Sequence, residues 1–204
     1  MKLFRPTGLR EMQLVLQRDL CGWPPRLPEQ PIFYPVLNIG YADQIARDWN
    51  TKSDSRVGYV TEFVVDDPYV AQFRREVVGS SRHEELWVPA EQLDEFNAHL
   101  VGPITMVRAF FGEDFAGLVP DRGSLRGKAA REQLEVLAAL FRRSPQDFHG
   151  EVATNREAVF LHIPFWRSEA AAFRDLDAPV AEVLAGVERA WREAFPALPL
   201  PEAG

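Results

Sequence analysis

The chain has very little cysteine and no long apolar run, and both absences limit what it can be. Cys21 is the single cysteine among 204 residues, so no disulfide can form within the chain and a reducing, cytoplasmic compartment is expected. We interpret Cys21 as a small buried apolar residue rather than as a nucleophile. No apolar stretch approaches the roughly 20 residues of a transmembrane helix, and the segment from Met1 to Pro6 has no signal-peptide pattern. The sequence therefore predicts a cytoplasmic protein with no membrane partner.

Positive charge is also scarce. Lys and Arg number 23 against 30 Asp and Glu, a formal net charge of −7. The arginines are scattered among acids and form no basic stripe, so we expect no stable binding of duplex nucleic acid, which depends on neutralising phosphates. Paired cysteines, a His-Glu-x-x-His pattern, a phosphate-cradling glycine loop and a Gly-x-Ser-x-Gly elbow are all missing, and His99, His149 and His162 lack metal-ligand spacing. We therefore expect no metal cofactor.

What the sequence does contain is a change of pattern near Gly112. The part before it, residues 1–112, is rich in short apolar or alternating runs, which predict strands. The part after it, residues 113–195, is mainly helical, and we expect it to pack on the first. Residues 196–204 are expected to be a disordered tail. The predicted class is α+β, with the elements as follows: strands over 3–5, 58–65, 84–89, 104–111 and 158–165; a strand or a loop packed on the core over 32–37; helices over 8–20, 41–49, 67–73, 89–97, 127–141 and 180–195.

A proline-rich loop over 22–31 follows the first predicted helix, because its four prolines exclude helix and sheet interior. Two interpretations of this loop stay open, a cover over a ligand site and a rigid structural connection. Asn38 precedes the predicted helix over 41–49 and is a candidate cap for it.

The most informative segment is His83-Glu84-Glu85-Leu86-Trp87-Val88-Pro89, in which a glutamate opens an apolar strand. A carboxylate at the start of a strand can face a ligand while the apolar residues after it anchor the backbone. Glu85 is therefore a candidate catalytic residue, although a solvent-facing acid at a strand start is the simpler interpretation. His83, two residues earlier, can donate to a ligand near neutral pH or be an ordinary loop histidine.

Two further candidates come from the N-terminal part. Arg5 stands on the first predicted strand, where its planar guanidinium can hold a phosphate or a ribose, or can be a surface charge. Tyr34, beside Phe33, can stack on a flat heterocycle or pack in the core. A separate hypothesis is an unrelated α+β enzyme whose pocket is lined by Asn155, Arg156, His162 and Trp166. The simpler interpretation of this segment is a buried core strand.

Taken in order, these features resemble the ADP-ribosyltransferase superfamily over residues 1–111. Three segments carry the resemblance: Leu3-Phe4-Arg5; Phe33-Tyr34 followed by Ala42 on the predicted helix; and His83-Glu84-Glu85-Leu86-Trp87-Val88-Pro89. The chain departs from the family where Tyr34-Pro35-Val36 replaces a Ser-Thr-Ser triplet and where His83 replaces the Glu or Gln two positions before the glutamate. That second departure argues against arginine as the acceptor.

The resemblance implies a split mixed or antiparallel sheet with flanking helices, followed by a mainly helical C-terminal extension. It also implies an enzyme that takes NAD as substrate and transfers ADP-ribose to an unknown acceptor, whether protein, nucleic acid or small molecule, or else to water as an NAD glycohydrolase. Glu85 is then catalytic, while Arg5, Phe33, Tyr34 and His83 bind NAD. The alternative is a non-catalytic partner-binding or immunity-like module on the same fold.

Overall fold

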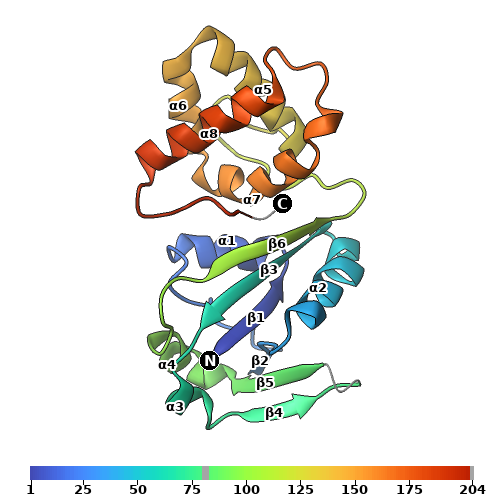
Figure 1. Cartoon of the computed structure of the whole chain (residues 1–204), viewed down its shortest axis with the longest axis vertical. Coiled ribbons are helices and arrows are strands. Elements are labelled where there is room, and N and C mark those ends of the chain that lie inside the picture. Colours follow the sequence, from blue (N-terminus) through green and yellow to red (C-terminus); the bar gives the residue numbers. More distant parts are fainter. Residues whose placement is uncertain (80–82, 203–204) are drawn as a thin grey trace. The chain divides into compact units, whose positions relative to one another are not determined.

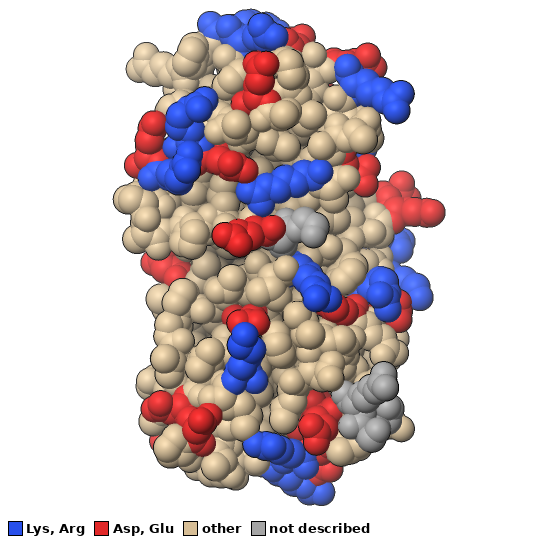
Figure 2. Space-filling model, in the orientation of Figure 1, with Lys and Arg blue, Asp and Glu red and all other residues tan. Residues whose placement is uncertain are grey.

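The computed structural model describes residues 1–79 and 83–202, and the chain divides into two compact units, Met1–Gly112 and Glu113–Gly204 (Figure 1). The first unit combines two small antiparallel sheets with short helices, and the second is built from helices. The predicted α+β class is therefore confirmed. No helix in the described ranges is long and apolar enough to cross a membrane. Acidic and basic side chains are interspersed over the face drawn in Figure 2.

Two three-stranded sheets form the framework of the first unit. One has the order β1-β3-β6, with β1 at Lys2–Thr7, β3 at Val57–Val64 and β6 at Thr105–Phe111; the other has the order β2-β5-β4, with β2 at Ile32–Phe33, β5 at Glu84–Pro89 and β4 at Arg74–Val77. The prediction for β5 has the observed bounds, whereas β4 was not predicted, because the four residues of β4 are mostly charged. The predicted strand over 32–37 is shorter, since its regular pairing ends at Phe33.

A single residue, Val36, links the two sheets. It forms isolated antiparallel bridges with Phe4 of β1 on one side and with Glu85 of β5 on the other. Phe4 and Val36 exchange backbone hydrogen bonds of 2.9 and 2.8 Å, and Leu86 N donates to Pro35 O at 2.8 Å. The chain segment after β2 therefore lies between β1 and β5, the strand that carries Glu85.

Helices α1 (Leu9–Gln17) and α2 (Ile39–Asp48) contact opposite faces of β1. Phe4 packs in a cluster with Tyr41 of α2, whereas Arg5 forms an ion pair with Glu11 of α1. Neighbouring strand residues point to opposite faces, which separates these two contacts. Asn38 caps α2 as predicted, because its side chain accepts hydrogen bonds from the first backbone N–H groups of the helix.

Two short helices complete the first unit, α3 at Asp67–Val70 and α4 at Leu93–Ala98. The first is shorter than the predicted helix over 67–73. The predicted helix over 89–97 is divided into a 3-10 turn, Ala90–Gln92, and α4. Cys21 is exposed, so its interpretation as a buried apolar residue was wrong: it lies in the turn after α1, where its neighbours Leu20 and Gly22 are buried and its own side chain faces solvent.

Over residues 113–202 the second unit has four α-helices, α5 at Ala130–Arg143, α6 at Pro145–Thr154, α7 at Arg156–Ser168 and α8 at Val180–Ala194, and a 3-10 turn at Ala170–Ala172. The prediction of a strand over 158–165 was wrong, since this segment lies inside α7. Every residue from Ala158 to Trp166 is buried. A helix that is covered on all sides has no polar face, so its continuous apolar run resembles that of a buried strand.

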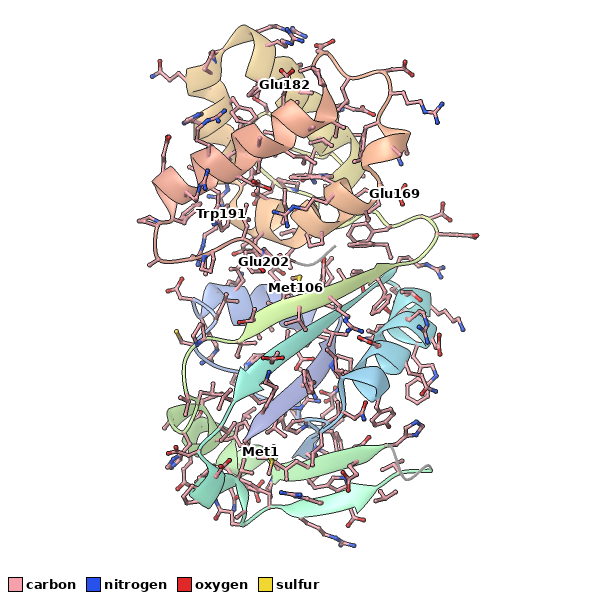
Figure 3. All side chains as sticks on the ribbon, viewed as in Figure 1. Met1, Met106, Glu169, Glu182, Trp191 and Glu202 are labelled. Atoms are coloured by element: carbon pink, nitrogen blue, oxygen red, sulfur yellow. The ribbon has the colours of Figure 1, made fainter. Side chains whose placement is uncertain are left out.

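The end of the chain is packed rather than disordered over the residues that the structure describes, 196–202. Trp191 of α8, labelled in Figure 3, donates its indole N–H to Leu198 O at 2.6 Å, and Leu198 is buried. Arg167 of α7 donates to Pro201 O. The predicted tail was therefore wrong for these residues, and its last two, 203 and 204, lie outside the described part.

Candidate functional site

Glu85 is the second residue of β5, and the backbone on both sides of it is fixed. Val36 pairs with it, Leu37 N donates to Glu84 O at 3.1 Å, and Leu86 is fully buried. The Glu85 side chain is partly exposed, and its Oε1 accepts a 2.9 Å hydrogen bond from the Tyr41 hydroxyl. The result is an accessible carboxylate with one oxygen held in a defined position.

Tyr41, in the first turn of α2, is a site residue that the sequence analysis missed, since its spacing suggested only an apolar helix face. It is buried, and burial raises the pKa of its hydroxyl to about 12, with the hydrogen bond to Glu85 and the charge of Glu85 adding to the effect. The hydroxyl therefore keeps its proton at neutral pH and remains a donor. No local pattern in the sequence pairs it with Glu85, which is 44 positions away.

His83 belongs to the same group. Its ring stacks on Tyr41, with centroids 4.1 Å apart and planes inclined by 9°. Its Nδ1 lies 3.2 Å from Val78 O, and because a carbonyl oxygen accepts, Nδ1–H is the donor. The structure therefore brings together His83, Tyr41 and Glu85.

Arg5 is held on the other face of β1 by a two-point ion pair. Its Nε donates to Glu11 Oε1 at 2.8 Å and its Nη2 donates to Glu11 Oε2 at 3.1 Å. The guanidinium carbon lies 4.5 Å from the centroid of Phe33. Phe33 is fully buried, so in this structure its ring supports Arg5 from within the core and does not present a face to a ligand.

Tyr34 lies between these two groups. Its carbonyl accepts a 3.1 Å hydrogen bond from Arg5 Nη1, and its ring meets the ring of Trp87 edge to face at a centroid distance of 5.6 Å. Trp87 is two residues after Glu85 on β5, so the two side chains leave the same face of the strand. Tyr34 is partly exposed. Contacts thus connect Arg5 through Tyr34 to the strand that carries Glu85.

The backbone segments that carry Arg5, Tyr34 and Glu85 lie side by side. Their side chains nevertheless form two groups, one around Glu85 and one around Arg5. The first group offers an exposed carboxylate fixed by a neutral phenol, which suits stabilisation of positive charge. The second offers a guanidinium whose orientation is set by a carboxylate, which suits recognition of an anion.

The alternative pocket in the second unit is divided by the fold. Asn155 and Arg156 line a hollow of about 230 Å³ at the start of α7. His162 is fully buried, and burial lowers its pKa to about 3. Its Nε2 accepts from Leu118 N at 2.8 Å, and its Nδ1 is 3.0 Å from Gln133 Oε1, to which it donates. These bonds use both ring nitrogens, so His162 acts as a structural connector.

Within residues 1–79 and 83–202, no three His, Cys, Asp or Glu side chains gather in a way that would hold a metal ion. Comparison of the chain with family models, with curated proteins and with solved structures finds no match.

Proposed function

We propose that the chain is an enzyme that breaks the bond between nicotinamide and ribose in NAD and transfers ADP-ribose to an acceptor or to water. The observation that carries this proposal is the environment of Glu85, a partly exposed carboxylate at the start of β5, held by Tyr41. The neighbouring strands support it: Glu85 pairs with Val36, which pairs with Phe4, the residue before Arg5. The resemblance to the ADP-ribosyltransferase superfamily rests on these three segments.

The reaction needs a stabiliser of positive charge. When the bond between the ribose C1′ and the nicotinamide nitrogen breaks, its electron pair stays with the nitrogen, which loses its formal charge, and the ribose becomes an oxocarbenium-like cation. An acceptor lone pair then forms the new bond to C1′, and the acceptor proton passes to the solution. Glu85, hydrogen-bonded to a ribose hydroxyl, stabilises the cation, and a carboxylate oriented in advance by Tyr41 does so without reorganising.

The other residues supply binding. Tyr34 is partly exposed and offers its ring to the flat nicotinamide, while the neighbouring Arg5 provides positive charge for the phosphates. His83 stacks on Tyr41, the residue that holds the Glu85 carboxylate, and we assign it to the acceptor side of the site. Phe33 contributes to binding indirectly, because its ring packs against the guanidinium of Arg5.

The test is nicotinamide release from NAD by the purified chain, followed in Glu85→Gln and in Glu84→Gln as the matched control. Glu84 is the adjacent carboxylate on the same strand, and its side chain leaves the opposite face. We expect Glu85→Gln to reduce release at least 100-fold and Glu84→Gln to change it less than threefold. Unchanged release in Glu85→Gln, or no release by the unmodified chain with protein, nucleic-acid and small-molecule acceptors present, would contradict the proposal.

One observation favours the second candidate, a non-catalytic partner-binding module. Arg5 and Glu85 each already have an internal partner, Glu11 and Tyr41, which is also what structural charges require. A module of this kind predicts a stable protein complex that survives Glu85→Gln and Arg5→Ala. Loss of the complex in these variants would count against it.

A further inference from the structure

A second arginine lies beside the first. Arg26, in the proline-rich loop before β2, directs its Nη1 to the carboxylate oxygen Oε1 of Glu11, which also accepts from Arg5. The two arginine side chains are 12% and 10% exposed. A single carboxylate therefore serves two mostly buried guanidinium groups, and the three charges sum to +1.

Arg26 is the less satisfied of the two. Its contact with Glu11 is long, at 3.5 Å, whereas Arg5 forms two shorter bonds. The Nε of Arg26 is buried and has no hydrogen-bond partner in the described part of the chain. Burial lowers the pKa of Arg26, and the positive charge of Arg5 lowers it further, against the opposite influence of Glu11 and Tyr34. A buried charged donor without an acceptor is costly, and an anion removes that cost.

The loop that carries Arg26 is held in place. Asn97 of α4 binds both backbone groups of Trp23, accepting from its N–H at 2.8 Å and donating to its carbonyl at 3.0 Å. The Trp23 ring is fully buried against Phe33 and Phe63. The rigid interpretation of the proline-rich loop is therefore the one that the contacts support, and Arg26 is presented without an ordering cost when a ligand binds.

Tyr34 adds an aromatic side to this arrangement. Its carbonyl is bound by Arg5, and its side chain is partly exposed. Two adjacent guanidinium groups match a diphosphate, whose charge and number of acceptor oxygens exceed those of a single carboxylate. The partly exposed ring beside them can stack on a flat heterocycle.

We infer that Arg26 and Arg5 together form the binding site for the diphosphate of a nucleoside diphosphate, with Tyr34 at its edge. Arg26 is thus a further binding residue, supplied by the loop rather than by any of the three motifs. The inference deepens the proposed function and rests on it only in naming NAD as the molecule that carries the diphosphate.

The experiment is titration calorimetry of the purified chain with ADP, with inorganic pyrophosphate and with adenosine as the uncharged probe. We expect ADP and pyrophosphate to bind and adenosine to bind at least tenfold more weakly. Loss of a charge-assisted hydrogen bond should weaken ADP binding by roughly 10- to 100-fold in Arg26→Gln. Arg26→Lys keeps the charge without the planar fork, so its affinity for ADP should lie between that of the unmodified chain and that of Arg26→Gln.

The matched control is Arg18→Gln, which removes an exposed arginine from the end of α1, and it should leave ADP binding unchanged. Thermal unfolding of each variant reports whether it is folded, and Arg26→Lys serves in place of Arg26→Gln if the latter is not. Equal ADP binding by the unmodified chain and both Arg26 variants, or no binding of ADP and pyrophosphate, overturns the inference.

Nicotinamide release measured in parallel separates the two proposals. Binding of ADP that depends on Arg26, in a chain that does not consume NAD, supports the diphosphate site and counts against the proposed reaction. NAD consumption with an unchanged KM in Arg26→Gln supports the reaction and overturns the role of Arg26.

Discussion

The hydroxyl of Tyr41 donates a 2.9 Å hydrogen bond to Oε1 of Glu85, and the two residues are 44 positions apart in the sequence. The bond joins the first turn of α2 to the first residues of β5. It fixes one oxygen of the carboxylate and leaves the other available. Orientation of this kind is what a group that stabilises a short-lived cation requires.

Tyr41→Phe should therefore affect catalysis more than folding. The ring and its stack on His83 are retained, and only the hydroxyl is lost. We expect kcat for nicotinamide release to fall roughly 10- to 100-fold and the free energy of unfolding to fall by about 1 kcal/mol. Steady-state kinetics and urea unfolding measure the two effects. A fall in stability without a fall in kcat would assign Tyr41 a structural role alone.

Tyr69→Phe is the matched control. Tyr69 is also a buried tyrosine of the first unit stacked on a histidine, His99, but its hydroxyl has no hydrogen-bond partner in the described residues. Removing an unsatisfied buried hydroxyl should leave the free energy of unfolding unchanged or raise it slightly. Nicotinamide release should not change.

Glu11→Gln should destabilise the first unit, because it leaves the guanidinium groups of Arg5 and Arg26 facing each other without a carboxylate. We expect a loss of about 1–3 kcal/mol in the free energy of unfolding. Part of that loss should be recovered when Arg26→Gln is added, since one of the two like charges is removed. A double-mutant cycle by urea unfolding measures the coupling, and strictly additive effects would show that the two arginines do not interact through Glu11.

His162 should make the second unit sensitive to acid. Its pKa in the folded chain is about 3, below the ordinary value of 6.5, so the unfolded chain binds a proton that the folded chain excludes. The stabilisation is fully present above pH 6.5 and is lost as the pH falls from 6.5 toward 3. We expect the unmodified chain to lose about 1.4 kcal/mol more than His162→Gln between pH 7.5 and pH 5.5. An identical pH dependence of urea unfolding in both proteins would refute this assignment.

Gly58→Ala should disturb the packing of α2 on β3. A Cβ at Gly58 would lie 2.2 Å from the carbonyl oxygen of Ala46, a backbone atom that cannot rotate away. We expect a loss of about 1–3 kcal/mol in the free energy of unfolding, together with a lower rate of nicotinamide release, because α2 carries Tyr41. The comparison is Gly150→Ala, where a Cβ meets nothing within 4 Å inside α6. That change should raise stability by about 0.5–1 kcal/mol through helix propensity.

Local signals in the sequence were sufficient for part of the fold. The apolar run that follows Glu84 and Glu85 predicted β5 with its observed bounds, and Asn38 was recognised as a cap because a side-chain acceptor before a helix satisfies its first N–H groups. The single cysteine excluded a disulfide framework within the chain. These features depend on neighbours in the chain, which a sequence displays directly.

Features that depend on burial were harder to predict from the sequence. The apolar run inside α7 resembled a strand because all of its sides are covered. The residues after Pro196 looked like a tail because a pattern of residue types does not show the hydrogen bonds from Trp191 and Arg167 that hold them. Neither error concerns propensity; both concern what surrounds the segment.

For the candidate site, the sequence by itself determined the chemical types: a carboxylate opening an apolar strand, an arginine on the first strand and an aromatic residue between them. Only the tertiary structure decided the partners. It paired Glu85 with Tyr41, placed Arg5 on the opposite face of β1 with Glu11, and brought Arg26 from the loop to the same carboxylate. The physical reason is that hydrogen bonds and ion pairs act over a few ångströms, and only the folded chain brings residues from separate elements that close together.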